Sequence, residues 1–183
     1  IHLEKTQQKG SIMSDAYTNL ARKTLENYVK TGSLPAVDKG KLPPELTKTR
    51  AGAFVSLKKH GQLRGCIGTI CAVQPDLASE IMMNAVSAGT GDPRFPSVRP
   101  DELDDLVYSV DVLGEPEQVY SLDDLDVKKY GVIVSNGPRR GLLLPDLEGV
   151  DTPEQQVSIA MQKGGIRPDE PISLERFEVI RHK

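Results

Sequence analysis

The chain has 183 residues, of which 38% are hydrophobic and 27% charged, and its formal net charge is −3. This length and composition are typical of a globular protein of one domain, or of two small lobes that share a core. It argues against a membrane span, because the apolar runs are too short. It also argues against nucleic-acid binding, because no run of Lys and Arg exceeds two residues and aromatic residues make up only 4%.

The first half of the chain predicts a polar arm, two helices and a hairpin. Residues 1–12 lack periodicity and are expected to form a linker, with a single domain over 13–183. The start at Ile1 indicates a fragment or a processed product. A helix is predicted over 14–31, capped by Ser14 or Asp15 and ended by Gly32. A loop follows over 32–49. Hairpin strands are predicted at 53–58 and 63–71, and a second helix from Pro75 or Asp76 to Gly89.

The second half predicts mainly strands. The segment 89–103 contains three prolines and is expected to be a loop. Strands are predicted at 106–113, 118–120, 131–135, 140–144 and 174–181, with a turn at Asn136 and Gly137. A third helix is predicted over 151–163, with Asp151 and Glu154 at capping-box spacing. The mixture of helices and hairpins predicts an α+β fold whose sheet is antiparallel or mixed and flanked by helices.

The stretch LRGCIGTI at 63–70 contains Cys66, one of two cysteines. A nucleophilic thiol needs a base. Of the three histidines, His2 and His182 are terminal, and His60 lies in the hairpin turn, roughly 20 Å along the strand. The absence of a suitable histidine favours a small buried or groove-lining cysteine over a catalytic one. The low cysteine content and the lack of a signal sequence predict a cytoplasmic protein.

Other familiar sites are absent from the sequence. A disulfide between Cys66 and Cys71 would span roughly 16 Å of strand, which is too far. Too few Cys and His residues are present for structural zinc, so no metal site is predicted. The acidic runs at 101–105 and 123–126 leave a hard-cation site of carboxylates open, but each is better explained as a solvated turn or helix start. No phosphate loop or nucleophile elbow is present, and no cofactor is indicated.

Three arginines lie where glycine or proline constrains the backbone. Arg64 precedes Gly65, Arg140 precedes Gly141, and Arg94 lies in the DPRFP segment with Asp92 as a possible orienting group. Such arginines are able to converge on a carboxylate or phosphate, although spacing alone favours pairing of each with an acidic neighbour on the surface. The glycines at 65 and 68 mark a close approach, either of a packed element or of a ligand.

Four segments together carry a resemblance. LRGCIG at 63–68, DPRFPSV at 92–98, YGVIVSNGPRRGLLLP at 130–145 and AMQKGGI at 160–166 are similar, in order and spacing, to the AMMECR1 domain family. The resemblance covers roughly residues 13–182. It implies a larger and a smaller lobe with a groove between them. It also implies a role beside a Memo-like protein and a radical S-adenosylmethionine enzyme. The implied site residues are Arg64, Gly65, Cys66, Gly68, Asp92, Arg94 and Arg140.

Three functional hypotheses remain open at this point. In the first, the protein is an accessory module that holds an anionic small molecule or a partner peptide in a groove lined by LRGCIG and DPRFP. In the second, it is an enzyme that uses Cys66 as a nucleophile or group acceptor. In the third, LRGCIG is a purely structural element of an interaction domain. Whether a reaction is catalysed is not decided by the sequence.

Overall fold

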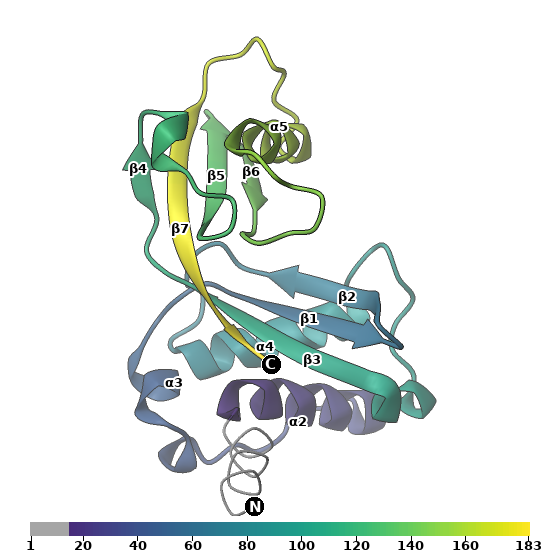
Figure 1. Ribbon diagram of the computed structural model, residues 1–183. Helices are drawn as coiled ribbons and strands as arrows, with labels where there is room; N and C mark the ends of the chain where they lie inside the picture. The colour runs from purple at the N-terminus through teal and green to yellow at the C-terminus, as the bar shows by residue number, and fades with distance from the viewer. Residues whose placement is uncertain (1–14) are drawn as a thin grey trace, which may run out of the picture. The chain divides into compact units, whose positions relative to one another are not determined.

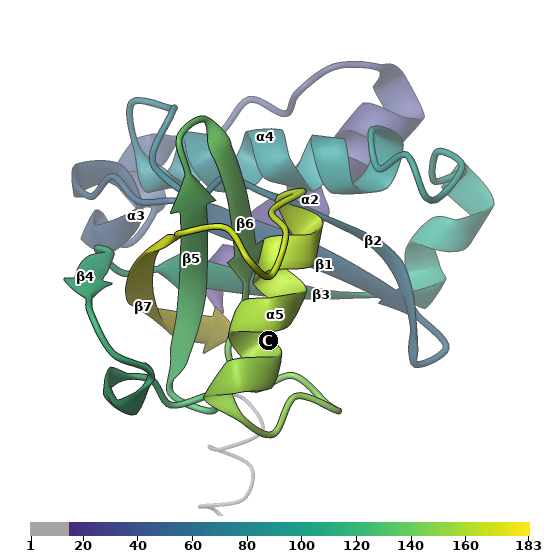
Figure 2. The ribbon, with the colours of Figure 1, turned by 90° about the horizontal axis from the view of Figure 1, so that it is seen from above.

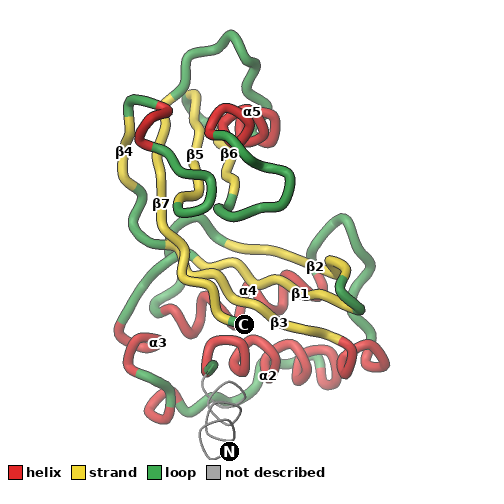
Figure 3. The backbone as a smooth tube through the Cα atoms, viewed as in Figure 1, coloured by secondary structure: helices red, strands yellow, loops and turns green. Residues whose placement is uncertain are grey.

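The computed structural model describes residues 15–183, and the chain divides into two compact units (Figure 1). Within the described part, unit 1 comprises residues 15–112 and 181–183, and unit 2 comprises residues 113–180. The arm expected at 1–12 lies outside the described residues. The strand pairs of both units are antiparallel, and helices accompany each sheet (Figure 3), so the predicted α+β fold is confirmed. Within residues 15–183 no helix is long and apolar enough to cross a bilayer.

Unit 1 begins with helix α2 (Ala16–Thr31), whose ends follow the sequence closely. The carboxylate of Asp15 accepts hydrogen bonds from the first-turn amides of Tyr17 and Thr18. Gly32 ends the helix in the left-handed conformation, with φ of 77°. The following segment, predicted to be a loop, contains a 3-10 turn η1 (Lys39–Lys41) and a short helix α3 (Pro44–Lys48). The loop prediction is wrong there because a proline is well suited to the first turn of a helix.

The sheet of unit 1 has β1 (Ala53–Lys59) between β2 (Gln62–Gly68) and β3 (Leu106–Leu113). His60 and Gly61 form the hairpin turn, both with positive φ, as a type I′ turn requires. Strand β2 ends at Gly68, three residues before the predicted end. The amides of Val73 and Gln74 then donate to the buried carboxylate of Glu80, which holds the chain in a loop instead.

Helix α4 (Leu77–Thr90) packs on β1 and β2 and against α2, so both helices lie on the same side of the sheet (Figure 1). The core between them includes Leu25, Val55, Leu57, Ile81 and Val110, all fully buried. Alternate residues of β1, namely Phe54, Ser56 and Lys58, therefore point to the other face of this sheet. After α4 the chain passes through the DPRFP segment and a 3-10 helix η2 (Pro100–Asp105) before it enters β3.

Unit 2 repeats this plan with a shorter second strand and a shorter helix. Its central strand is β5 (Tyr130–Asn136), which pairs with β6 (Arg139–Leu143) on one side and β7 (Ser173–His182) on the other. Strand β4 (Glu117–Val119) pairs with β7 and leads into a 3-10 turn η3 (Leu122–Asp124). Helix α5 (Pro153–Lys163) packs on β6 and β5 (Figure 2). Its core includes Val132, Val134, Ala160 and Leu174.

Two local predictions in unit 2 are each wrong by one residue. The capping box of α5 is formed by Thr152 and Gln155, because the Thr152 hydroxyl accepts from the amide of Gln155 at 3.2 Å. The predicted pair of acids one residue earlier does not form it. The β5–β6 turn consists of Gly137 and Pro138, with φ of 59° at the glycine. This order is typical of a type II′ turn, in which glycine takes the first central position.

The two units share one topology although the sequence shows no internal repeat. In each, a hairpin is followed by a helix that packs on that hairpin, and a third strand then pairs with the hairpin's first strand. The order β1, β2, α4, β3 in unit 1 therefore corresponds to β5, β6, α5, β7 in unit 2. This correspondence places the two Arg-Gly pairs, at 64–65 and 140–141, in the second strand of each hairpin.

Candidate functional site

The LRGCIG and DPRFP segments meet at the outer edge of β2 in unit 1. Strand β2 is an edge strand, so its outward backbone groups have no neighbouring strand. Asp92 supplies an acceptor there, because its Oδ2 accepts a hydrogen bond from the amide of Cys66 at 3.0 Å. Arg94 approaches the same residue, with Nη2 3.5 Å from the Cys66 carbonyl oxygen. The loop after α4 thus covers both outward backbone groups of Cys66.

Asp92 and Arg94 hold one another in a fixed geometry. Nε and Nη2 of Arg94 donate to the two carboxylate oxygens of Asp92 at 3.1 and 2.8 Å, and the amide of Arg94 donates to Oδ1 at 3.0 Å. The side chain of Asp92 is only 2% exposed. The Arg94 hydrogen bond, helped by the two backbone amides, holds the pKa of the Asp92 carboxyl well below its usual range despite burial. Asp92 is therefore a buried anion at neutral pH.

The outer part of the Arg94 guanidinium remains available. Its side chain is 57% exposed, and within residues 15–183 no acceptor contacts Nη1. The guanidinium also lies 5.4 Å from the centre of the Phe95 ring. A guanidinium fixed on one side by a carboxylate presents its remaining donors in a constant direction, which suits a planar carboxylate or a phosphate.

Cys66 does not have the surroundings of an activated nucleophile. Its Sγ lies 3.2 Å from the hydroxyl of Ser56 across the β1–β2 pair. Burial raises the pKa of the Cys66 thiol, and it outweighs the opposing effects of Ser56 and Arg94. The thiol is therefore protonated at neutral pH. Cys66 and Cys71 are both free, and Cys71 is exposed.

Neither described histidine serves Cys66. His60 lies 3.9 Å from Asp105, and His182 stacks on Tyr17 with ring centres 3.7 Å apart. His2 lies outside the described residues. Among residues 15–183 no group of three or more His, Cys, Asp or Glu side chains is placed to hold a metal ion. Among the described residues, therefore, no histidine and no metal-ligand cluster is placed to generate a thiolate at Cys66.

Arg64 is engaged inside unit 1. Its Nε and Nη2 donate to the two oxygens of Glu102 on η2, both at 3.0 Å, and Lys59 contacts the same carboxylate at 3.1 Å. The hydrogen bond from Arg64, with those from Lys59 and the Arg99 amide, lowers the pKa of Glu102 to about 2. The Arg64 side chain is 11% exposed. Arg64 therefore ties β2 to η2, while its buried Nη1 has no hydrogen-bond partner among residues 15–183.

Close packing accounts for both glycines of LRGCIG. A Cβ at Gly65 would lie 2.1 Å from the carbonyl oxygen of Ala88 in α4, and one at Gly68 would lie 2.2 Å from the ring of Phe54. Gly65 therefore lets the helix approach the strand, and Gly68 lets the Phe54 ring cover the opposite strand. The sequence left open whether a packed element or a ligand approaches these glycines. Packing alone explains both positions, so we do not place either glycine in the ligand site.

Arg140 belongs to unit 2 and has a different environment. Its Nη2 lies 4.0 Å from Glu175. The adjacent Gly141 repeats the role of Gly65, because a Cβ there would lie 1.7 Å from the carbonyl oxygen of Ala160 in α5. The second Arg-Gly pair thus marks the place where α5 packs on its hairpin.

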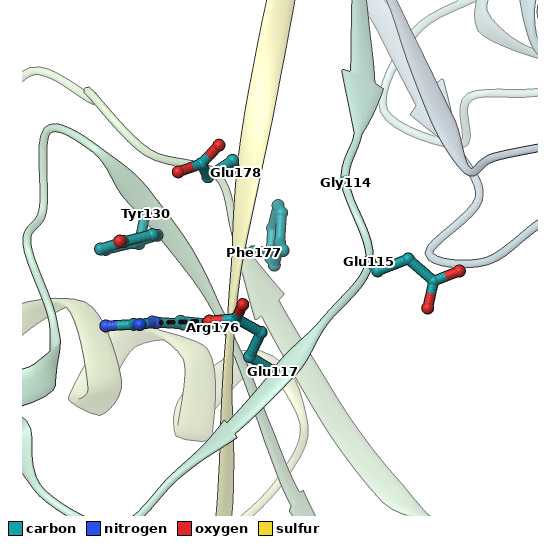
Figure 4. Close-up of a pocket in the computed structure, with 7 residues that line it drawn as sticks. All are labelled: Gly114, Glu115, Glu117, Tyr130, Arg176, Phe177 and Glu178. Carbon is teal, nitrogen blue, oxygen red and sulfur yellow. Dashed lines mark hydrogen bonds and ion pairs between the residues drawn. The ribbon is translucent and has the colours of Figure 1, made fainter.

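Unit 2 also contains a hollow of about 330 Å³ beside Tyr130. Figure 4 shows the guanidinium of Arg176 parallel to the Tyr130 ring, at 4.4 Å from its centre. Arg176 also pairs with Glu117 at 3.1 Å, and Glu178 lies 4.0 Å from Lys129. Arg176, Glu117 and Glu178 are thus already paired, whereas Glu115 lines the same hollow without a cationic partner among the described residues.

The sequence did not indicate several residues around Cys66. Ser56 carries no motif, and only its position opposite Cys66 in the hairpin would have revealed it. Glu102 was read as part of a solvated acidic run, yet it is 7% exposed. Asp111 is 3% exposed and binds Arg181 at 2.8 Å. A carboxylate in the middle of an apolar strand was the available signal for Asp111, because a buried charge requires a partner.

Comparison with known proteins identifies the family. The AMMECR1 family profile matches residues 18–182. The chain belongs to the AMMECR1 family. A Thermotoga maritima protein is 54% identical over 91% of this chain and 97% of its own length. A Clostridium acetobutylicum protein is 50% identical over 92% of this chain, which spans 36% of that longer protein.

A solved structure supports the same assignment. The uncharacterized protein PH0010 from Pyrococcus horikoshii superimposes with a TM-score of 0.83 and is 32% identical, covering 90% of this chain and 88% of that one. The AMMECR1 assignment confirms the resemblance of the LRGCIG, DPRFP and neighbouring segments. It establishes the fold and the family of this chain.

Proposed function

We propose that this AMMECR1 domain is a binding module, and that Arg94 holds a carboxylate or phosphate group of its ligand. One observation carries the proposal: Asp92 fixes Arg94 beside Cys66 while the outer guanidinium donors stay exposed. A guanidinium that is already oriented loses little conformational entropy on binding. The anion belongs either to a small molecule or to a peptide of a partner protein, and both use the same chemistry.

The partners that we propose are a Memo-like protein and a radical S-adenosylmethionine enzyme, with this domain as their accessory component. The support is the membership of the AMMECR1 family together with the absence of an activated nucleophile near Cys66. A longer relative that this chain spans only in part is compatible with a domain that works beside others. Free thiols at Cys66 and Cys71 suit a reducing cytoplasm.

The test compares two arginines that differ in their setting. Arg94→Gln removes the oriented guanidinium, and Arg99→Gln removes an arginine that is 71% exposed and pairs with the exposed Asp101. Calorimetric titrations with inorganic phosphate and with citrate test whether the anion belongs to a small molecule. Pull-downs with the purified Memo-like protein and the radical enzyme test the peptide source.

We expect Arg94→Gln to weaken at least one of these interactions about tenfold or more, and Arg99→Gln to leave it unchanged. Loss of anion binding alone identifies a small-molecule site, and loss of partner binding alone identifies a peptide site. Equal binding by the native chain and Arg94→Gln in both assays would contradict the proposal.

The main alternative is a purely structural role for the LRGCIG and DPRFP segments. Its support is that Asp92 covers the Cys66 amide and that Gly65 fits against Ala88. Under this alternative, Arg94→Gln lowers stability and leaves every binding assay unchanged. Measuring unfolding and binding on the same variant therefore separates the two functions.

A further inference from the structure

A groove of about 560 Å³ lies in unit 2, between the β4–η3 segment, helix α5 and the start of β7. Its floor is apolar, with Val119, Val157 and Leu174 each less than 9% exposed. Two large side chains beside it face the solvent, since Tyr120 is 86% exposed and Leu122 is 37% exposed. An exposed aromatic residue beside an apolar floor is typical of a surface that contacts another protein.

Two of the chain segments that line this groove belong to acidic stretches of the sequence. Residues 114–127, which form the β4–η3 side, contain no Lys, Arg or His, and residues 145–162, which lead into and form most of α5, contain none either. Both stretches instead carry exposed carboxylates. These are Glu115, Glu117, Asp123, Asp124, Asp126, Asp146, Glu148, Asp151 and Glu154.

The nearby cations do not neutralise this charge completely. Arg176 contacts Glu117 at 3.1 Å and the Asp124 carbonyl oxygen at 2.6 Å. Within residues 15–183, however, neither Asp123 nor Glu154 has a cationic partner. Glu154 precedes the groove residue Val157 by three positions on α5, so the two side chains lie on neighbouring parts of one helix face. A carboxylate therefore stands beside the apolar floor.

We propose that this groove binds a basic segment of a partner protein, with one apolar side chain on the floor and Lys or Arg side chains beside the carboxylates. Charge complementarity selects this occupant, because an acidic or neutral segment would gain nothing from Asp123 and Glu154. The exposed Tyr120 ring supplies both contact area and a face for a cation. This surface is independent of the Arg94 site, which belongs to unit 1.

The composition of the chain makes the test direct. The chain contains no tryptophan, so the emission of a tryptophan placed in a peptide reports its burial without background from the protein. The probe is the peptide Lys-Val-Lys-Trp-Lys-Val-Lys, blocked at both ends, and its control has Glu in place of every Lys. Each is titrated with the full chain in low-salt buffer, and the emission maximum is recorded.

The native chain is expected to give a saturable blue shift with the basic peptide and none with the acidic one. Tyr120→Ser, and separately the double change Asp123→Lys with Glu154→Lys, are expected to weaken binding about tenfold. The matched controls are Val107→Ser, which removes an apolar side chain 64% exposed in unit 1, and Asp104→Lys, which reverses an exposed charge there. Both controls are expected to bind as the native chain does.

Three results would overturn the inference. They are the absence of a saturable shift up to about 1 mM chain, equal binding of the acidic peptide, and unchanged binding by both groove variants. Circular dichroism of the variants checks that they are folded, and the surface charge reversal keeps the test valid if Tyr120→Ser unfolds. Arg94→Gln should bind the peptide normally, which distinguishes a failure of this groove from a failure of the Arg94 site.

Discussion

The Asp92 carboxylate accepts the amide hydrogen of Cys66 at 3.0 Å across 26 positions of sequence. This contact joins the LRGCIG and DPRFP segments, by which the family resemblance was found, and it indicates what each segment contributes to the structure. The LRGCIG strand lies at the edge of the sheet, with no neighbouring strand on its outer side. The DPRFP loop instead supplies the hydrogen-bond partners of Cys66 there, an acceptor from Asp92 and a donor from Arg94. Asp92 also holds Arg94 in place, through separate hydrogen bonds with the Arg94 amide and guanidinium, so any ligand function of Arg94 depends on Asp92.

Asp92→Asn should lower the free energy of unfolding by about 2 kcal/mol at pH 7, because a buried charge-assisted network loses its anion. The folded-state pKa of Asp92 is depressed, so its carboxylate stabilises the fold above the unfolded pKa of about 3.9. That contribution is lost as the pH falls through the folded pKa. The difference between native chain and variant should therefore shrink below about pH 4.

Urea unfolding of both proteins at several pH values measures this difference for Asp92→Asn. Asp101→Asn, which changes a carboxylate that is 72% exposed, serves as the control and should differ little at any pH. A gap that stayed constant from pH 7 to pH 3 would show that the charge of Asp92 is not what stabilises the loop.

Glu102→Gln tests the second buried carboxylate. The change leaves Arg64 buried opposite a neutral amide, and we expect a loss of about 3 kcal/mol at pH 7. The pKa of Glu102 is lowered to about 2, against an unfolded value near 4.3. Its contribution is complete above the unfolded pKa and is lost as the pH falls from about 4 toward 2.

Acid titrations followed by circular dichroism measure the Glu102 contribution. Replacing the pair together, as Arg64→Leu with Glu102→Leu, should restore part of the lost stability because the buried guanidinium is removed with its partner, while Lys59, which also loses Glu102, has a side chain 29% exposed to solvent. If the double change lowered the free energy of unfolding by the sum of the two single changes, there would be no coupling between Arg64 and Glu102, and the prediction would be wrong.

Much of the fold could be predicted from the sequence because it depends on local patterns of residues. The α2 helix has its cap at Asp15 and its stop at Gly32, and the β1–β2 turn has a His-Gly pair suited to positive φ. Periodicity also indicated the strand over 106–113 correctly. Each of these features involves residues a few positions apart, which is the range over which hydrophobic periodicity and turn chemistry act.

The partners in the site were less accessible because they are distant in sequence. Arg64 meets Glu102 across 38 positions, and nothing in the acidic run at 101–105 distinguishes the buried carboxylate from its exposed neighbours. The glycines gave the clearest signal of close approach. Deciding between a helix and a ligand as the approaching group required the position of Ala88.

The reactivity of the Cys66 thiol tests whether catalysis by this residue is tenable. In a Cys71→Ser background, the rate of alkylation by iodoacetamide should keep rising beyond pH 8.5, because burial raises the pKa of the Cys66 thiol. The reverse variant, Cys66→Ser, reports exposed Cys71 and should react faster at neutral pH. A rate for Cys66 that reached its plateau near pH 7 would indicate a thiolate and would revive the nucleophile hypothesis.

The equivalent glycines Gly65 and Gly141 should be equally intolerant of a side chain. A methyl group at either position would lie about 2 Å from a helix carbonyl oxygen, Ala88 in one unit and Ala160 in the other. Because the obstacle is backbone in a packed helix, Gly65→Ala and Gly141→Ala should each cost about 3 kcal/mol or more of unfolding free energy. Gly114→Ala, where the nearest atom would lie at 3.4 Å, is the matched control and should change stability little.

Equilibrium urea unfolding of the three glycine variants gives this comparison directly. If the shared topology has the same physical basis in both units, Gly65→Ala and Gly141→Ala lose similar stability. A large loss at one position with a neutral effect at the other would mean that one helix shifts to accommodate the methyl group. The helix would then pack less tightly on its strand at one Arg-Gly pair than at the other. The two units would share the order and pairing of their elements but not the same packing.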